Sequence, residues 1–349
     1  MRSSTVHSNR DAVSLLAGET MQEMSFAVAV SQAQLLARTF NKTRTGMPEK
    51  VAVIGAGTMG SGIASVFAAH GYSVAVYSRS EHTLETSRSF IEAASKEAVT
   101  IKYTTSLEAC LEGAALVSEN IAEDLKLKQA IFRRAEGLVS PDCLLTTNTS
   151  SVPISAIAEG LAFPERVVGV HWFNPATLMP LVEIVRGERT SDETVRRARA
   201  LCGYIGKQTI EVNQDIPGFV VNRLQYAILR EALYLVEEGV ASIEDVDRAV
   251  ETTLAPRWAA SGPLQLMDLA GLDVVEKVSG ILMPSLCRST DIPAIVRRLC
   301  EEGALGIKSG RGFYKWTPDG ISSTVRTRDE TVQLLTKRSR CKARDTATQ

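Results

Sequence analysis

Two ionisable side chains in neighbouring apolar runs could together move a proton. His171 closes the run 166–171, and Glu183 lies inside the run 181–185. Histidine is the usual base for an alcohol proton near neutral pH. A carboxylate among aliphatic residues is costly unless it has a partner, and beside a histidine it would select the tautomer and favour the imidazolium. We therefore expect a catalytic dyad; the alternative is a strand-end histidine with an ordinary hydrogen bond and a glutamate on an exposed edge.

The other three histidines are less well placed for this task. His7 belongs to the N-terminal stretch, and His70 ends a helical run that it can cap. His82 follows the second predicted strand, near the end where an adenosine would lie. Because ligands of open α/β sheets bind at the carboxyl ends of strands, His171 is the candidate base.

Three spaced glycines predict a loop that holds phosphate groups. The buried-type strand 51–54 precedes them, a helical run 61–69 follows, and a second apolar run covers 72–77. In such a loop the first glycine permits a tight turn, the second admits a pyrophosphate to the backbone, and the third lets helix and strand pack. The phosphates lie at the positive end of the helix. The segment predicts dinucleotide binding, rather than an ordinary glycine-rich turn, through Gly55, Gly57, Thr58, Met59 and Gly60.

The end of the second strand leaves the type of dinucleotide open. NAD-binding proteins normally carry an acid there for the ribose 2′-hydroxyl, whereas a nearby arginine accommodates the 2′-phosphate of NADP. Here the strand ends with Ser78 and Arg79. Both residues are candidate cofactor contacts, and NAD and NADP both remain possible. The alternative for Arg79 is a solvated loop residue.

Composition excludes several classes of protein. The chain has 349 residues, a net charge of −1, 44 % hydrophobic residues and 23 % charged residues, as in an ordinary globular protein of about two domains. The charge gives no reason to expect a nucleic acid or an anionic membrane, and no apolar run approaches the roughly 20 residues of a membrane span. Six cysteines without a CxxC pair predict no metal site and a reducing compartment. We expect a cytoplasmic protein, with mitochondrial targeting by the N-terminal stretch as the alternative.

The periodicity of apolar residues predicts two folded domains. Strands alternate with helices up to residue 214, which indicates a Rossmann-type, doubly wound α/β domain with a mainly parallel sheet over 47–214. After the Pro217-Gly218 breaker only helices are expected, so 215–318 should form an all-α domain, flanked by a poorly ordered extension (1–46) and a polar tail (319–349). The expected strands are 51–54, 73–77, 115–118, 143–147, 167–171 and 181–185. The main expected helices are 61–69, 81–95, 125–139, 192–205, 219–238, 264–283 and 292–302.

Seven motifs in order resemble the L-3-hydroxyacyl-CoA dehydrogenase family. They begin at Gly55-Ala-Gly-Thr-Met-Gly60, Asn148-Thr-Ser-Ser151, His171-Trp-Phe-Asn-Pro175 and Leu181-Val-Glu-Ile184, and they continue through 215–223, 262–273 and 308–314. The resemblance spans both domains, from about 49 to 316. It implies oxidation of a 3-hydroxyacyl thioester to its 3-oxo form, with NAD favoured, and a homodimer built through the helical domain.

The resemblance also assigns roles to matching positions. His171 corresponds to the base and Glu183 to its supporting carboxylate, while Ser150 and Asn222 match the polar pair near the reacting oxygens. Their alternatives are a helix N-cap for Ser150 and a polar residue on a helix face for Asn222. The positions that match cofactor contacts are Glu119, Asn174 and Lys308.

Two departures from the family pattern leave the substrate open. The interval from Ser78 to the strand at 115–118 is shorter than in the acyl-CoA enzymes, where it holds a helical hairpin that lines the CoA site. Arg257 could meet a substrate carboxylate or phosphate, and Trp258 could wall a pocket or pack between helices. A small free 3-hydroxy acid, as in the carnitine- and gulonate-oxidising relatives, is therefore the alternative substrate. The alternative class is a non-catalytic, crystallin-like structural homologue.

Overall fold

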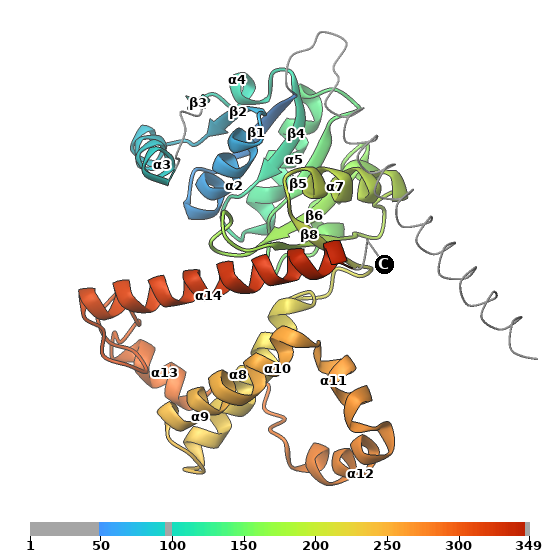
Figure 1. Ribbon diagram of the computed structural model, residues 1–349. Helices are drawn as coiled ribbons and strands as arrows, with labels where there is room; N and C mark the ends of the chain where they lie inside the picture. The colour runs from blue at the N-terminus through green and yellow to red at the C-terminus, as the bar shows by residue number, and fades with distance from the viewer. Residues whose placement is uncertain (1–48, 95–99, 346–349) are drawn as a thin grey trace, which may run out of the picture. The chain divides into compact units, whose positions relative to one another are not determined.

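The chain folds into two compact units. In the computed structural model, residues 49–94 and 100–345 are described, so the predicted extension 1–46 lies outside the described residues. The first unit comprises the chain up to Phe219 together with its end from Ser339 onward, and the second unit covers Val220–Arg338 (Figure 1).

An eight-stranded sheet forms the centre of the first unit (Figure 1). The strand order is β3-β2-β1-β4-β5-β6-β7-β8, and all neighbouring strands are parallel except β6 and β7. The strands are β1 (Lys50–Ile54), β2 (Ser73–Tyr77), β3 (Ile101–Thr104), β4 (Ala114–Glu119), β5 (Leu144–Thr147), β6 (Val167–Trp172), β7 (Leu181–Val185) and β8 (Gln208–Val212). The mainly parallel, doubly wound sheet predicted from the sequence is confirmed.

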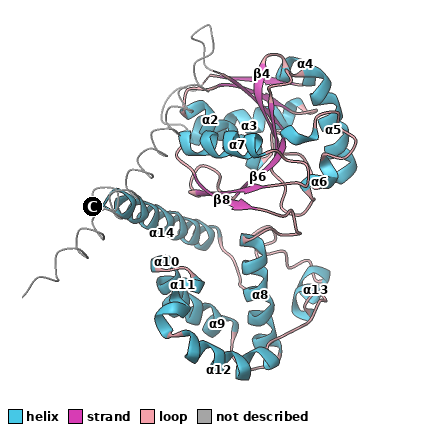
Figure 2. Ribbon diagram, turned by 90° about the vertical axis from the view of Figure 1, so that its right-hand side faces the viewer, coloured by secondary structure: helices cyan, strands magenta, loops and turns pink. Residues whose placement is uncertain are grey.

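Helices cover both faces of this sheet, as Figure 2 shows. One apolar core lies under α2 (Thr58–Ala69), α3 (Glu81–Ala94) and α7 (Asp192–Tyr204). The other lies under α4 (Leu107–Leu111), α5 (Leu125–Leu138) and α6 (Ile154–Ile157). Because both faces are buried, the inner strands are mainly apolar, and their apolar runs could be recognised in the sequence. Ser106 caps α4, Asp124 caps α5 and Ser191 caps α7 by accepting backbone N–H groups.

The second unit is helical, as predicted. Its α-helices are α8 (Val221–Glu237), α9 (Ile243–Ala249), α10 (Ala255–Ala260), α11 (Pro263–Ala270), α12 (Leu272–Leu282), α13 (Ala294–Glu301) and α14 (Pro318–Asp345) up to Arg338. A five-residue π-helical segment, Val250–Leu254, joins α9 to α10. The single helix expected over 264–283 is divided at Gly271, whose φ of 90° an α-helix cannot accommodate.

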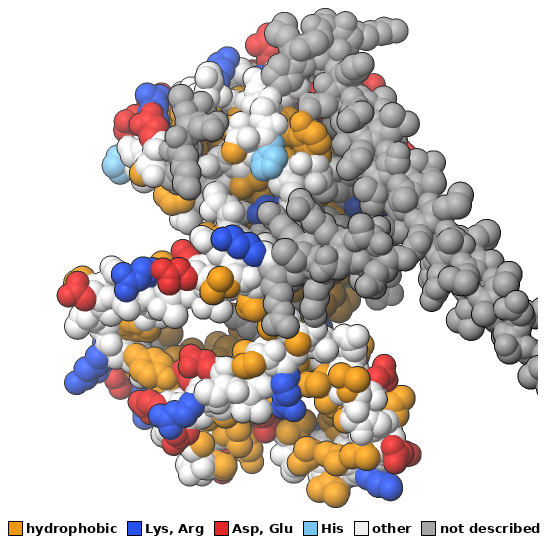
Figure 3. Space-filling view, in the orientation of Figure 1, with side chains coloured by type: hydrophobic (Ala, Val, Ile, Leu, Met, Phe, Trp, Pro, Cys, Tyr) orange, Lys and Arg blue, Asp and Glu red, His pale blue; other side chains and the backbone are white. Residues whose placement is uncertain are grey.

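Apolar side chains of the second unit are largely exposed. Among residues 220–337 only Leu233 and Ala304 are buried. Figure 3 shows hydrophobic side chains gathered over α11 and α12. No described helix is both long enough and apolar enough to cross a membrane.

Candidate active site

His171 and Glu183 face each other across the antiparallel pair β6–β7. They are direct register partners, and Nδ1 of His171 lies 2.6 Å from Oε2 of Glu183. Glu183 is fully buried and His171 is 3 % exposed, so the exposed-edge alternative does not hold for this glutamate. A carboxylate can only accept a hydrogen bond here, so the proton of the neutral imidazole is on Nδ1. Nε2 is left with a lone pair, as a base requires.

Ser150 presents its hydroxyl to that lone pair. The turn that follows β5 places Ser150 Oγ 3.0 Å from His171 Nε2. Because Nε2 is unprotonated in this tautomer, the serine hydroxyl donates and the imidazole accepts. Ser150, His171 and Glu183 therefore form one hydrogen-bonded line that starts at a half-buried hydroxyl and ends at a buried carboxylate.

Two aromatic rings enclose the imidazole, and neither was predicted. The Phe173 ring centre lies 4.7 Å from that of His171, and the Phe219 ring centre lies 5.4 Å away. Phe219 is 1 % exposed and has a φ of 48°, a left-handed conformation that is uncommon for a residue with a bulky side chain. Such strain persists where the surroundings hold it in place. The sequence contains no periodic signal for a contact of this kind.

The glycine loop has the shape that a pyrophosphate requires. Gly55 has a φ of 104°, and a Cβ on Gly60 would lie 1.8 Å from the carbonyl oxygen of Gly55. A Cβ on Gly57 would meet no described atom within 4 Å, so the second glycine borders open space. Gly57 caps α2 without a side-chain hydrogen bond, and the first turn holds no acid. The N-terminus of α2 is thus suited to an anionic group.

The remaining candidate cofactor residues are spread over both units. Thr58, Arg79 and Asn174 are exposed, whereas Met59 and Ser78 are half-buried in the first unit. Asn222, in the first turn of α8, and Lys308, after α13, belong to the second unit. Their roles at the site stay predictions. Arg257 is exposed on α10 and donates to the carbonyl oxygen of Thr253 at 3.1 Å.

Glu119 differs from the other candidates because its carboxylate is fully buried. Lys128 Nζ lies 2.9 and 3.0 Å from its two oxygens, Thr147 Oγ1 donates at 2.6 Å, and the Ile121 amide donates at 2.6 Å. Burial raises the pKa of this carboxyl, and the Lys128 ammonium acts in the opposite direction. With both oxygens bonded inside the protein, the carboxylate shapes the loop after β4 and is closed to a direct cofactor contact in this conformation.

Glu123 is a site residue that the sequence reading missed. It lies just before α5 and accepts a hydrogen bond from the Ser150 backbone amide at 2.6 Å and from Thr149 Oγ1 at 2.7 Å. In the sequence it stands beside Asp124, just before a helical run, where its charge looks like one more solvated side chain. No described group of histidine, cysteine, aspartate and glutamate side chains could hold a metal ion.

Comparison with protein families identifies both units. Residues 50–216 match the 3-hydroxyacyl-CoA dehydrogenase NAD binding domain, and residues 218–316 match the C-terminal domain of the same family. The chain belongs to the 3-hydroxyacyl-CoA dehydrogenase family. The predicted resemblance is confirmed, the chain is an oxidoreductase, and NAD is the cofactor that its first domain indicates.

Individual members of the 3-hydroxyacyl-CoA dehydrogenase family match along most of their length. The chain is 36 % identical over 285 residues to 5-formyl-3-hydroxy-2-methylpyridine 4-carboxylate 5-dehydrogenase of Mesorhizobium japonicum, covering 78 % of this chain and 92 % of that protein. It is 37 % identical over 286 residues to 3-hydroxybutyryl-CoA dehydrogenase of Mycobacterium tuberculosis, covering 77 % and 98 %. A crystal structure of a 5-formyl-3-hydroxy-2-methylpyridine 4-carboxylic acid 5-dehydrogenase, described as an NAD⁺ dependent dismutase, aligns with a TM-score of 0.77 at 35 % identity, covering 82 % and 96 %.

Proposed function

We propose that this chain oxidises the 3-hydroxyl group of an L-3-hydroxyacyl-CoA to the 3-oxo group, reversibly and with NAD, and that His171 is the base. The observation that carries the proposal is the line from Ser150 through His171 to Glu183, at the carboxyl edge of the sheet that carries the glycine loop. Bound NAD supplies the acceptor for the hydride that leaves the carbinol carbon.

Side chains of the protein itself accept the hydroxyl proton and hold the reacting oxygen in place. Nε2 of His171 takes the hydroxyl proton, and Glu183, 2.6 Å from Nδ1, stabilises the imidazolium that results. Ser150 holds the substrate oxygen near Nε2, and Asn222 keeps the role that its match to the family pattern implies. Phe173 and Phe219 limit water around the imidazole. Much of the rate gain then comes from positioning.

A small free 3-hydroxy acid is the second candidate substrate, favoured by one observation of the structure. The described residues between β2 and β4 form α3, the short strand β3 and the five-residue helix α4. The helical hairpin that lines the CoA site in the family's acyl-CoA enzymes does not occur among them. The Mesorhizobium relative is named for a pyridine carboxylate substrate, which supports this second candidate.

Parallel turnover assays test both candidates. We would measure oxidation of 3-hydroxybutyryl-CoA, free 3-hydroxybutyrate, carnitine and gulonate with NAD and with NADP. Turnover of the thioester with NAD supports the proposal, whereas turnover of free acids alone would replace it with the second candidate. Absence of turnover with every substrate would contradict both and favour a structural homologue. Arg79→Ala should leave the preference for NAD unchanged if Arg79 is a solvated loop residue.

We further propose that the second unit joins two copies of this chain in a homodimer. A unit with two buried side chains among residues 220–337 lacks a core of its own. Leu264, Leu269, Leu272 and Ile281 on α11 and α12 are between 63 % and 82 % exposed, which is typical of a surface that a partner covers.

The five described cysteines are free, which supports a reducing, cytoplasmic compartment.

A further inference from the structure

The loop between β6 and β7, residues 173–180, begins beside the candidate base. Its first residue is Phe173, whose ring centre lies 4.7 Å from that of His171. Asn174, which matches a cofactor contact of the family, follows directly and is exposed. The pairing of β6 with β7 ends at Trp172, so the sheet does not fix the path of this loop. The placement of both side chains therefore depends on what holds the loop.

Lys207 holds the middle of this loop. Its ammonium donates hydrogen bonds to the carbonyl oxygens of Ala176 and Met179, each at 2.6 Å. The same ammonium lies 5.3 Å from the ring centre of Trp172, the last residue of β6. An ammonium has three donors, and hydrogen bonds from a charged donor are shorter and stronger than neutral ones. One half-buried side chain thus binds the loop at two points and contacts the strand from which the loop leaves.

The backbone of Lys207 is itself fixed on both sides. Its N–H donates to the carbonyl oxygen of Cys202 at 2.8 Å, across Gly206, whose φ is 73°. This bond is of the Schellman type and ends α7. The next residue, Gln208, begins β8 and donates to the carbonyl oxygen of Pro180 at 2.8 Å. Lys207 is therefore a rigid support and not a side chain that follows the loop.

The helix α2 contacts the same part of the loop. Ala176 is 3 % exposed, and a Cβ on Gly62 of α2 would lie 3.2 Å from the Cβ of Ala176. The methyl group of Ala176 thus packs on α2, while its carbonyl oxygen is bound by Lys207. A segment that is held at its side chain and at its carbonyl has little freedom to shift. Without the ammonium, only the packing contact remains.

We propose that Lys207 is a positioning residue, which holds the loop 173–180 so that Phe173 packs on His171 and Asn174 is presented at the carboxyl edge of the sheet. This inference rests on the proposed function of His171 and NAD. Without Lys207, two carbonyl groups in part-buried surroundings lose their donor, and the loop relaxes to bring them to water. A displacement of about 1 Å at a group that positions the reactants can cost on the order of 10²-fold in rate.

A comparison of two lysines tests this role. Lys50 Nζ also donates to two backbone carbonyl oxygens, of Ala109 at 3.3 Å and of Glu112 at 2.6 Å, but at the amino end of β1. Lys207→Met keeps the aliphatic stem and removes the donors. It should lower kcat by about 10- to 100-fold and raise the Kd for NAD by about 10-fold. Lys50→Met should leave both constants close to wild type.

Calorimetric titration with NAD gives the Kd, and steady-state kinetics with 3-hydroxybutyryl-CoA gives kcat. A loss in either constant that is specific to Lys207→Met supports the inference. Values of both constants within about twofold of those of Lys50→Met would overturn it.

Thermal unfolding shows whether each variant is folded at the assay temperature. If Lys207→Met does not fold, Lys207→Arg takes its place. This variant keeps the charge, but a planar guanidinium does not fit the position of the compact ammonium between two carbonyl oxygens. It should show the same losses to a smaller extent, and wild-type constants in Lys207→Arg would then overturn the inference.

A double-mutant cycle asks whether Lys207 acts through the loop. In a background that carries Phe173→Ala and Asn174→Ala, Lys207→Met should cost no more than about twofold in either constant, because the side chains that it positions are gone. Additive losses would overturn the inference and indicate that Lys207 acts elsewhere.

His171→Ala, measured with the same substrate and cofactor, separates this inference from the proposed function. An active His171→Ala protein contradicts the proposed function itself. An inactive one, combined with wild-type constants in Lys207→Met, contradicts only the positioning role of the lysine.

Discussion

His171 provides the most direct test of the chemistry. Replacing it with alanine removes the base while leaving Glu183 and Ser150 without their shared partner, so kcat should fall by about 10²- to 10⁴-fold. Steady-state kinetics on a substrate that the wild-type enzyme turns over is the measurement. His82→Ala, an exposed histidine on α3, is the matched control and should retain wild-type activity. Wild-type kcat in His171→Ala would exclude this histidine as the base.

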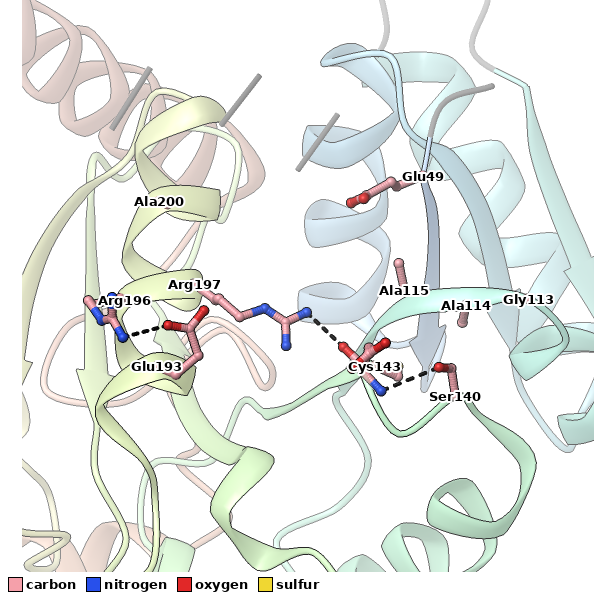
Figure 4. Close-up of a pocket in the computed structure, with 11 residues that line it drawn as sticks. Glu49, Gly113, Ala114, Ala115, Ser140, Cys143, Glu193, Arg196, Arg197 and Ala200 are labelled. Atoms are coloured by element: carbon pink, nitrogen blue, oxygen red, sulfur yellow. Dashed lines mark hydrogen bonds and ion pairs between the residues drawn. The ribbon is translucent and has the colours of Figure 1, made fainter. Parts of the chain in front are cut away.

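Glu49 should make the stability of the first unit depend on pH. Figure 4 shows it beside the cavity at the amino ends of β1, β4 and β5, with Arg197 of α7 across from it. Burial raises the pKa of its carboxyl to about 7, partly opposed by Arg197, and its Oε2 is buried without a hydrogen-bond partner among the described residues. The folded state therefore binds more protons than the unfolded state between about pH 4.5 and 7, and stability falls as the pH rises through this window.

The variant Glu49→Gln removes this dependence. It should match the wild type near pH 4.5 and be more stable by about 1–2 kcal/mol at pH 8, after a discount for partial exposure. Urea unfolding across this pH range measures it. Glu193→Gln, whose side chain is 59 % exposed on the same cavity, is the control. Equal pH slopes in wild type and Glu49→Gln would contradict the prediction.

The roles of some residues could be predicted from the sequence, whereas the roles of others could not. Glu183 could be suspected because an acid inside an aliphatic run is conspicuous, and His171 because it ends such a run. No sequence pattern distinguishes Glu123 or Phe219, since each contacts a site residue that is distant in sequence. The burial of the Glu119 carboxylate likewise depends on Lys128, a full turn into the next helix.

The stability of the protein should depend on Lys128, the buried lysine of helix α5. Removing one partner of a buried ion pair leaves the other charge uncompensated, which typically costs about 3–5 kcal/mol. Lys128→Ala should therefore lower the free energy of unfolding by about that amount, because Glu119 is left in a site with no exposed surface. Lys126→Ala, exposed on the same helix, should change it by less than about 0.5 kcal/mol. A loss below about 1 kcal/mol in Lys128→Ala would show that the pair is not stabilising.

Among secondary-structure elements, burial decides what the sequence reveals. The inner strands and the amphipathic helices were predicted because apolar periodicity is strong where a face is covered. The strands β3 and β8 were missed because they form the two edges of the sheet and their side chains are only partly buried. The helix α14 occupies most of the predicted polar tail, and its residues have a low apolar content and no marked stripe, so nothing in the pattern separates it from a solvated segment.

The assembly of the molecule is tested by an arginine on the α11–α12 surface. Ile281 is 75 % exposed on α12, and Ile281→Arg should convert a dimer to a monomer because a charge would be buried at the interface. Sedimentation velocity of the full chain gives the mass. Leu138→Arg, an exposed apolar residue of the first unit, is the control and should remain dimeric. A monomeric wild-type protein would contradict the proposed homodimer.

The pairing of β6 with β7 has a consequence for how this enzyme can be damaged. His171 and Glu183 are opposite one another only in the native register, and a slip by one residue turns every side chain of a strand to the other face of the sheet. Misregistered molecules would therefore have no dyad, rather than a weaker one. Heat treatment should therefore lower the fraction of active molecules, while each remaining active molecule keeps its full turnover rate. The residual activity then measures the fraction of chains in which β6 and β7 pair in the native register.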